Sequence, residues 1–410
     1  LVPIPDDFPG KKDRTVKLKM RIEKVGGDGC AGCGPRRADT LGRGGPTPVY
    51  CWYCDEVVRK TATTQHAGGS RSEADVNTVR AEGDRPATKT AHRTPEVVIS
   101  LNVNSLHAAV RDRGLVAFIN RTRADTYAFQ ETMAAPSSKR WKKKWELVAA
   151  MALFKRWGYS AYWNPSTRND GGYGGTMILT KHEASLVVKG TGDRLIDEEG
   201  RFLALVYPDR IVINTYAPTL GLDLSGQSRK TRFWEKSEAR YLEIKHLYPG
   251  RTTIWVGDIN VAPLEHDADT AGIMKWLSKC KMKVKVAKTL PACTTTERDE
   301  LEQFMQRNQL KDAFEDQLDE ENGKLARGVD RYTHYMHGLR ASGAGMRLDL
   351  VLTDAVPSRL GEGVGAVSLI KSRVMTDAFC SDHLPVETVF ERWASVAAPG
   401  RRSQGQTTER

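Results

Sequence analysis

Residues 253–260 have the sequence TIWVGDIN, in which an apolar, β-branched run ends on an aspartate and an asparagine two positions apart. Apolar runs of this kind are typical of buried strands. Four further segments carry polar residues in a similar setting: 101–104 (LNVN), 130–132 (QET), 214–218 (NTYAP) and 381–385 (SDHLP). Polar groups at the ends of strands in one sheet can converge on one site, as sites built on an α/β scaffold do. The five segments together therefore predict an α/β domain with one polar centre.

Composition is that of a soluble globular protein with an excess of positive charge. Of the 410 residues 40% are hydrophobic, which is enough for a sizeable core, and the formal net charge is +11. This charge indicates a polyanionic partner such as nucleic acid. Many basic proteins have no such partner, so composition alone leaves the question open. No apolar run approaches the roughly 18 residues of a membrane span, and we expect no membrane association.

Four regions differ in pattern along the chain. Residues 1–60 are a basic extension, and residues 61–95 lack the apolar area that would offset their ordering entropy, which predicts a disordered linker. Strand and helix patterns alternate over residues 96–393, which predicts one α/β domain of roughly 300 residues. Helices are expected at 104–119, 233–247 and 298–308. The polar, basic residues 394–410 are expected to form a disordered tail.

Four of the seven cysteines form a CxxC…CxxC pair within residues 25–60, namely Cys30, Cys33, Cys51 and Cys54. Seventeen residues separate the two motifs, a spacing within the range of structural Zn²⁺ sites. A segment with so few apolar residues gains folding free energy from a bound metal. We therefore predict a small zinc module with four cysteine ligands. Coincidental cysteines and two labile disulfides are the alternatives.

Taken together, the five polar segments resemble the exonuclease III-type apurinic/apyrimidinic endonucleases of the endonuclease/exonuclease/phosphatase superfamily. The likeness runs from Glu96 to Phe390. Further matching segments lie at 171–179, 199–201, 232–242, 294–298 and 346–349. The last two favour the DNA-repair branch over the lipid and inositol phosphatases. The resemblance implies a four-layer α/β sandwich, in which two mixed β-sheets pack face to face with helices outside.

The resemblance also implies a site for Mg²⁺ or Mn²⁺. Mg²⁺ prefers oxygen ligands, keeps several waters and usually takes one or two protein carboxylates. Glu131 is the expected main carboxylate, with Asn102 and Asn104 as neutral ligands or supports. The full set of expected metal contacts is Asn102, Asn104, Glu131, Asp258, Asn260, Asp382 and His383. For Glu131 alone, the alternative is a salt-bridged carboxylate at a strand end.

Catalytic roles are implied by the same resemblance. Asp258 is expected to activate the attacking water, and Asn260 to hold that water or the phosphate. The alternative for this pair is a local Asx turn at the end of a strand. His383 is expected to contact a phosphate oxygen while Asp349 holds its other ring nitrogen and fixes the tautomer. Tyr216 is expected to offer its phenol to a phosphate oxygen, although a tyrosine in a strand is often a core residue.

Substrate contacts are expected in two places. An extruded abasic sugar would enter a small apolar pocket, which the resemblance places at His334, Met346 and Leu348. Relatives carry an aromatic residue at the first position, and the more polar histidine weakens the expectation of tight abasic-sugar selection. The residues expected to contact the DNA backbone are Lys142, Lys143, Lys144, Gly174 and Arg201. The alternative for the lysines is a solvated helix face anchored by Trp141 and Trp145.

These expectations describe a metal-dependent DNA phosphodiesterase of base-excision repair that cuts 5′ to abasic sites, with 3′–5′ exonuclease or 3′-phosphodiesterase activity beside it. Two alternatives stay open: the target-nicking endonuclease domain of a non-LTR retrotransposon, and a catalytically silent nucleic-acid-binding protein. The expected partner is double-stranded DNA with abasic or blocked 3′ ends, bound by a monomer. The expected location is the nucleus. Mitochondria, another organelle and the bacterial cytoplasm stay open, because the chain opens on Leu1 and a targeting segment can be missing.

Overall fold

The computed structural model describes residues 93–139, 141–280, 288–314, 331–336, 339–357 and 367–393. The chain divides into two units, residues 1–89 and 90–410, and every described residue belongs to the second. Several predicted features lie outside the described residues: the extension 1–60 with Cys30, Cys33, Cys51 and Cys54, most of the linker 61–95, and the tail 394–410. For these features the sequence predictions stay predictions.

The first sheet is mixed and has seven strands. They are β1 (Arg93–Asn102), β2 (Thr126–Gln130), β3 (Ser160–Asn164), β4 (Thr176–Thr180), β11 (Val356–Pro357), β12 (Val367–Val374) and β13 (Val386–Trp393). Their order is β11-β12-β13-β1-β2-β4-β3. The central strand β1 runs parallel to β2 and antiparallel to β13. The last residues of β1 and β2 therefore lie at the same end of the sheet as the first residues of β13.

The second sheet is also mixed and has six strands. They are β5 (Leu186–Lys189), β6 (Phe202–Val206), β7 (Arg210–Tyr216), β8 (Thr252–Asp258), β9 (Lys311–Asp312) and β10 (Asp349–Thr353). Their order is β5-β6-β7-β8-β10-β9. Strand β7 runs parallel to β8, and β10 runs antiparallel to β8. As in the first sheet, the last residues of two strands, β7 and β8, and the first residue of a third, β10, lie at the same end of the sheet.

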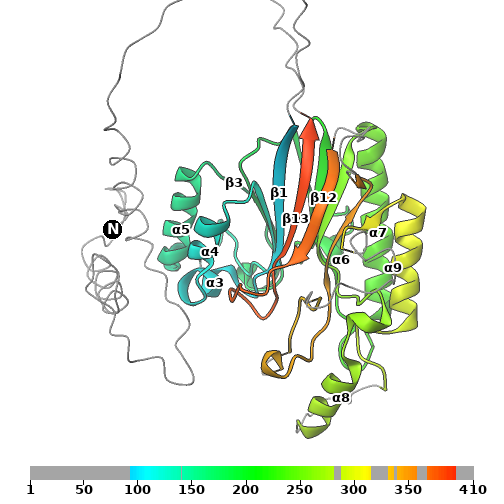
Figure 1. The fold of residues 1–410 in the computed structure, drawn as a ribbon. Helices are drawn as coiled ribbons and strands as arrows, with labels where there is room; N and C mark the ends of the chain where they lie inside the picture. Colours follow the sequence, from blue (N-terminus) through cyan, green and yellow to red (C-terminus); the bar gives the residue numbers. More distant parts are fainter. Residues whose placement is uncertain are drawn as a thin grey trace, which may run out of the picture. The chain divides into compact units, whose positions relative to one another are not determined.

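Helices cover the outer faces of both sheets. The α-helices are α3 (Leu106–Asp112), α4 (Leu115–Thr122), α5 (Trp145–Arg156), α6 (Arg194–Asp197), α7 (Gln227–Leu247), α8 (Thr270–Lys279) and α9 (Thr295–Asn308). Short 3₁₀ helices are η2 (Trp141–Lys143), η3 (Arg168–Gly171), η4 (Glu265–Asp267) and η6 (Arg340–Ser342). Figure 1 shows α3, α4 and α5 on one side of β1 and β13, and α7 and α9 on the other. Within the described ranges, no helix is both long and apolar enough to span a membrane.

Three apolar clusters hold these layers together. One joins the first sheet to its helices and includes Phe129 of β2 and Phe154 of α5. A second joins the other sheet to α7 and α9 and includes Trp255 and Phe304, whose ring centroids are 5.0 Å apart. The third lies between the two sheets. The predicted four-layer α/β sandwich is therefore confirmed.

Strand alternation explains how polar groups reach the space between the sheets. Val98 of β1 belongs to the cluster between the sheets, while the next residue, Ile99, packs toward the helices. Because side chains alternate along a strand, Asn102 continues the inward row of Val98. Ile254 belongs to the same inner cluster, and Asp258 continues its row along β8. Two apolar rows thus end in polar residues at the same end of the sandwich.

The structure corrects several predicted boundaries. Residues 104–119, predicted as one helix, form α3 and α4, because Gly114 breaks the helix with a left-handed φ of 72°. Strand β1 begins at Arg93, so residues 93–95 belong to the sheet rather than to the linker. Helix α7 begins at Gln227 rather than at residue 233. Helix α9 begins at Thr295, where Thr294 and Glu297 form a capping box.

Gly257, directly before Asp258, provides a test of this architecture. Its φ is 147°, and a Cβ there would lie 1.9 Å from the carbonyl oxygen of Thr215 in the neighbouring strand. Gly257→Ala should therefore lower the free energy of unfolding by about 3 kcal/mol or more. Gly114→Ala is the matched control, since its φ is 72° but no atom lies within 4 Å of the added Cβ. It should cost about 1 kcal/mol. Equal losses in urea unfolding would contradict the clash.

Candidate active site

The predicted polar segments meet at one end of the sandwich. Asn102 ends β1, and Glu131 directly follows β2. In the second sheet, Asp258 ends β8 and pairs directly across the strands with Asp349, the first residue of β10. His383 lies shortly before β13, which runs antiparallel to β1. The centre is therefore built from both sheets rather than from one.

Asn102 connects the two sheets at this centre. Its Nδ2 donates to Glu131 Oε1 and to Asp258 Oδ2, both at 2.9 Å. Its Oδ1 accepts from the backbone N–H of Asn104 at 3.0 Å. Because the amide nitrogen has two hydrogens, it can hold both carboxylates at once. Asn102 is fully buried, so these hydrogen bonds are shielded from water.

The backbone turns sharply where the polar residues leave their strands. Asn104, Glu131 and Asn260 have positive φ values of 39°, 48° and 54°. Such values are uncommon for residues other than glycine, and a glutamate is a rarer case than an asparagine. Backbone hydrogen bonds hold the Glu131 turn, because its carbonyl oxygen accepts from the N–H of Ser105 at 2.9 Å. Backbone strain of this kind persists where surrounding contacts enforce it, often at functional sites.

Asp258 accepts one hydrogen bond from its own turn and another from the other sheet. Its Oδ1 accepts from the backbone N–H of Asn260 at 3.0 Å, which is the Asx turn of the alternative interpretation. Its Oδ2 accepts from Asn102 in the other sheet. Burial raises the pKa of Asp258 to about 7, against the opposing effect of His383 and with a further rise from Asp349. The amide of Asn260 is fixed by a 2.9 Å hydrogen bond to the carbonyl oxygen of Ala217.

The expected contact between His383 and Asp349 is present. His383 Nδ1 lies 2.7 Å from Asp349 Oδ2, and both side chains are buried. Thr333 Oγ1 accepts from the backbone N–H groups of Leu348 and Asp349, which fixes the start of β10. Burial alone would lower the pKa of His383, but Asp349, Asp258 and Asp382 raise it to about 10. At neutral pH the side chain of His383 is therefore the imidazolium cation, protonated on both ring nitrogens.

Asp382 and Asn104 meet at the rim of the centre. Asn104 Nδ2 donates to both carboxylate oxygens of Asp382 at 3.2 Å, and Ser381 donates to Asp382 Oδ1 at 2.9 Å. Burial would raise the pKa of Asp382, but His383, His334 and these hydrogen bonds lower it below its ordinary value. Asp382 is therefore a carboxylate at neutral pH.

Arg201, one of the expected DNA contacts, is buried and packs against Tyr216. Its side chain is 2% exposed, and its guanidinium lies 4.3 Å from the ring centroid of Tyr216. It also donates to the carbonyl oxygen of Tyr216 at 2.8 Å. Burial, together with the nearby Glu131, raises the pKa of Tyr216 well above its ordinary value. The charge of Arg201 opposes this rise in pKa, so its part is to hold the ring and backbone of Tyr216 in place beside Glu131.

Gly174, the other expected DNA contact in this region, is also buried. Its φ is 54°, and a Cβ would lie 2.6 Å from the carbonyl oxygen of Glu199. Its own carbonyl oxygen accepts from the N–H of Met133 at 2.9 Å. The glycine is therefore explained by close backbone packing under the turn that carries Glu131.

The three expected pocket residues lie together but are largely packed. The backbones of His334 and Met346 exchange hydrogen bonds of 2.8 and 2.9 Å, and the rings of His334 and His383 are 4.5 Å apart. Burial and His383 lower the pKa of His334 to about 3, so its imidazole is neutral. Met346 and Leu348 are 6% and 4% exposed and belong to an apolar cluster with α8. Of the three, only His334 has a ring that contacts the imidazole of His383.

The lysine-rich run is not one helix. Lys142 and Lys143 lie in η2, and Lys144 precedes α5, where its ammonium donates to the carbonyl oxygen of Met133 at 3.4 Å. Trp141 packs edge-on against Trp163, with ring centroids 5.4 Å apart. The anchoring by Trp141 is therefore present, while the continuous helix face of the alternative interpretation is not.

Comparison with known proteins agrees with this geometry. The sequence profile of the Endonuclease/Exonuclease/phosphatase family matches residues 99–383.

The chain belongs to this family.

Curated relatives of this chain include enzymes named for DNA cleavage. The chain is 25% identical over 295 residues to a "DNA-(apurinic or apyrimidinic site) endonuclease" of Dictyostelium discoideum, covering 72% of this chain and 70% of the relative. It is 24% identical over 294 residues to an "Exodeoxyribonuclease" of Bacillus subtilis, covering 72% and 98%. The "DNA repair nuclease APEX1" of Danio rerio is 28% identical over 295 residues, covering 72% and 81%.

Solved structures share the fold. An AP endonuclease from Leishmania major superposes with a TM-score of 0.53 at 22% identity, covering 77% of this chain and 92% of that one. A 3′ phosphatase from Neisseria, bound to a product DNA hairpin, has a TM-score of 0.53 at 18% identity and covers 72% and 98%.

The residues at the centre fit the hard divalent cation that this family implies. The donors are carboxylate and amide oxygens, which Mg²⁺ prefers. Asp349 Oδ1 is buried without a hydrogen-bond partner among the described residues. Across the same ranges, no three Asp, Glu, His or Cys side chains are grouped to hold one ion. The first candidates to hold such an ion are Glu131 and Asn102, whose side chains are joined by a 2.9 Å hydrogen bond.

Lys230 and Glu297 support the centre, although the sequence patterns did not single out the lysine. Lys230 is fully buried in α7, and its ammonium donates to Glu297 Oε1 at 2.6 Å and to the carbonyl oxygen of Asn260 at 2.5 Å. Glu297 lies in the segment 294–298 that the family resemblance singled out, and in the structure it forms a capping box with Thr294 at the start of α9. Nothing in the composition of α7 marks one of its lysines as buried. The ion pair ties α7 and α9 to the turn that follows Asp258.

Removing one partner of this ion pair should be costly. Lys230→Met leaves Glu297 as a buried unpaired charge and should lower the free energy of unfolding by about 3–5 kcal/mol. Lys230→Met combined with Glu297→Leu should recover most of that loss, because no buried charge remains. The measurement is urea unfolding of each variant.

The control for this series is Lys245→Met in the same helix. Lys245 pairs with Asp354 at 2.9 Å, but the two side chains are 27% and 25% exposed. Pairs exposed to this degree contribute about 0–1 kcal/mol. A Lys230→Met loss no larger than that of Lys245→Met would contradict a buried ion pair beneath Asn260.

Proposed function

We propose that this chain is a divalent-metal-dependent DNA phosphodiesterase that cuts the backbone 5′ to abasic sites and also trims blocked 3′ ends. The observation that carries the proposal is the pair of carboxylates, Glu131 and Asp258, held by Asn102 opposite a protonated His383. Phosphodiester hydrolysis needs a positioned water and donors for the developing negative charge. The names of the curated relatives support DNA as the substrate.

Each polar side chain has a defined task in this proposal. His383 donates a proton in a hydrogen bond to a nonbridging phosphate oxygen, while Asp349 holds the other ring nitrogen. Asp258, with a pKa near 7, accepts the proton of the attacking water. Tyr216 stays neutral and donates its phenol to the phosphate. Asn260 positions the water or the phosphate through its amide.

A bound Mg²⁺ or Mn²⁺ supplies Lewis-acid stabilisation of the phosphate and leaving oxygens. Glu131 would hold it, with Asn102, Asn104 and the carboxylate of Asp382 as neighbouring oxygen donors. The expected metal contacts at Asp258 and Asn260 are proposals of the same kind. The expected contact at His383 is not proposed, because an imidazole protonated on both nitrogens has no lone pair for a metal ion. Lys143 and Lys144 would contact the DNA backbone beyond the centre.

A second candidate is nicking of undamaged DNA, as expected of a retrotransposon endonuclease. The observation that favours it is the wall of the expected sugar pocket. There His334 presents a neutral imidazole, and Met346 and Leu348 are packed in an apolar cluster. A polar, tightly packed wall selects less strongly for an abasic sugar than an open apolar pocket does.

One assay tests both candidates. The full chain is incubated with duplexes that contain an abasic site, a 3′-phosphate or no lesion, with Mg²⁺ or with EDTA. The proposal predicts Mg²⁺-dependent cleavage of the first two and little of the third. Equal cleavage of the unlesioned duplex would favour nicking of undamaged DNA. Absence of cleavage in all three would overturn the proposed function.

Glu131→Gln should raise the Mg²⁺ concentration needed for half-maximal cleavage while leaving DNA affinity nearly unchanged. The reason is that contacts from Lys and Arg to phosphates supply most of the affinity, whereas the carboxylate serves the ion. Glu146→Gln is the control, because Glu146 is half-buried beside His107 rather than at the centre. An unchanged metal titration in Glu131→Gln would remove Glu131 from the metal site.

His383 and Asp349 should behave as one unit. Removing one positioned donor typically costs about a hundredfold to a thousandfold in rate, so His383→Ala and Asp349→Ala should each lose about that much. The double variant should be barely slower than His383→Ala, because members of a unit are not additive. The control is His182→Ala, which removes a histidine that is paired with Glu96. Losses that multiply in the double variant would show independent roles.

The N-terminal cysteines support a separate proposal that rests on their spacing alone. We expect one Zn²⁺ per chain, bound by Cys30, Cys33, Cys51 and Cys54, and lost in Cys51→Ser. Elemental analysis of protein purified without chelator is the measurement, and absence of stoichiometric zinc would contradict it.

We propose further that the chain acts as a monomer on duplex DNA and that it works in the nucleus.

A further inference from the structure

Phe379 differs from the other aromatic residues of the domain. Among the Phe, Tyr and Trp side chains whose exposure the structure describes, it alone is exposed, with 55% of its surface accessible. It lies in the loop 375–385 between β12 and β13, four residues before His383. The residue that follows it, Cys380, is buried, so the loop turns its phenyl ring outward.

One face of this ring is already occupied. The guanidinium of Arg340 lies 4.3 Å from the centroid of the Phe379 ring. Arg340 is held in place because its Nη2 donates to the carbonyl oxygens of Thr376 and Ala378, both at 3.1 Å. A cation over one face of an aromatic ring is a stabilising arrangement. The ring is therefore fixed, and its exposed surface belongs to its other face and edge.

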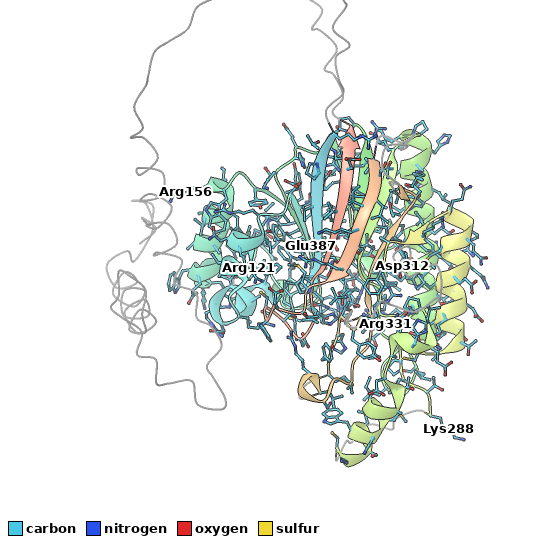
Figure 2. The ribbon with its side chains drawn as sticks, viewed as in Figure 1. Arg121, Arg156, Lys288, Asp312, Arg331 and Glu387 are labelled. Atoms are coloured by element: carbon cyan, nitrogen blue, oxygen red, sulfur yellow. The ribbon has the colours of Figure 1, made fainter. Side chains whose placement is uncertain are left out.

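The loop that carries Phe379 is fixed to the body at a second point. Arg121 of α4, labelled in Figure 2, forms an ion pair with Asp377 at 2.6 Å. Arg340 also lies 6.0 Å from the ring of Tyr335, whose backbone N–H donates to the carbonyl oxygen of Asp382 at 3.3 Å. Phe379 is thus an aromatic surface that is backed by Arg340 and linked through Tyr335 to the backbone of Asp382.

We propose that Phe379, backed by Arg340, is a stacking platform for a nucleobase of the DNA bound at the centre. The inference rests on the proposed function, because it assumes that the scissile phosphate lies at His383. Stacking of a base on an aromatic side chain needs only one ring face and is independent of base identity. The cation behind the ring adds attraction for the phosphates on either side of that base.

A protein partner fits the observation less well. Protein docking needs a contiguous apolar patch. The other large exposed apolar residues of the described ranges are Leu195, Leu242, Leu247, Leu264, Val356 and Ile370. None of them lies in the loop 375–385 or in the loop 339–343. A single ring face beside a guanidinium is instead suited to a base with its flanking phosphate.

The test separates binding from cleavage. Binding of the full chain to an abasic duplex is measured in EDTA, for the wild type, Phe379→Leu and Phe379→Trp. Phe379→Leu keeps an apolar side chain but removes the ring, and it should weaken binding about tenfold to a hundredfold. Phe379→Trp should bind at least as tightly as the wild type. The salt dependence of binding should stay unchanged in both, because no phosphate contact is removed.

A spectroscopic readout identifies the contact itself. The duplex carries 2-aminopurine at one position at a time around the abasic site. Wild-type protein should quench its fluorescence at one position more than at the others, and Phe379→Leu should remove that quenching. Leu242→Ala, which truncates a side chain that is 52% exposed on α7, is the control and should change neither readout.

The outcomes distinguish the two proposals. Wild-type affinity and wild-type quenching in Phe379→Leu would overturn the stacking platform, even if the protein cleaves abasic DNA. Loss of both in Phe379→Leu would support the platform. Failure of the wild type to cleave any duplex in Mg²⁺ would overturn the proposed function, whereas the binding experiment would still report on the platform.

Discussion

The centre depends on the hydrogen bonds by which Asn102 joins the two sheets. One amide nitrogen holds Glu131 at the end of β2 and Asp258 at the end of β8, each at 2.9 Å. The two carboxylates come from separate sheets. The apolar clusters of the sandwich hold its layers together but do not by themselves position these two side chains. The amide, together with the left-handed turns at Glu131 and Asn260, fixes where the carboxylates lie. The sandwich supplies rigidity, and the hydrogen bonds of Asn102 set the positions of the two carboxylates.

The electrostatics of the centre follow from this crowding. Asp258, Asp349 and Asp382 surround one protonated histidine, and Glu131 lies beside Asp258, which leaves more carboxylates than local cations. Burial, Asp349 and Glu131 raise the pKa of Asp258, while Asp349, Asp258 and Asp382 raise that of His383. A divalent cation would offset the remaining negative charge. Nearby, Lys230 balances Glu297 rather than the centre itself, so it stabilises the turn at Asn260 without neutralising Asp258.

Sequence patterns predicted the α/β class and the polar centre because both depend on local rules, whereas the four layers came from the family resemblance. Apolar, β-branched runs along β1 and β8 predicted the strands, but the helix α9 was expected to begin at residue 298 and begins at Thr295. Tertiary packing decided the rest. The break at Gly114 depends on one left-handed residue, and the burial of Arg201 depends on its stacking against Tyr216. Lys230 was missed because a lysine in a polar helix gives no sign of a buried partner. Cys30, Cys33, Cys51 and Cys54 lie outside the described residues, so their spacing remains the only support for a zinc site.

The single-turnover cleavage rate of Asn102→Asp on an abasic duplex tests the bridge between the sheets most directly. The substitution keeps the shape of the side chain but replaces the donor by a third carboxylate facing Glu131 and Asp258. Circular dichroism should show a folded protein, because the cores are untouched. At saturating Mg²⁺ the rate should fall about a hundredfold to a thousandfold, as expected when a positioned donor is lost. A folded variant that cleaves within a few-fold of the wild-type rate would contradict the central place given to Asn102.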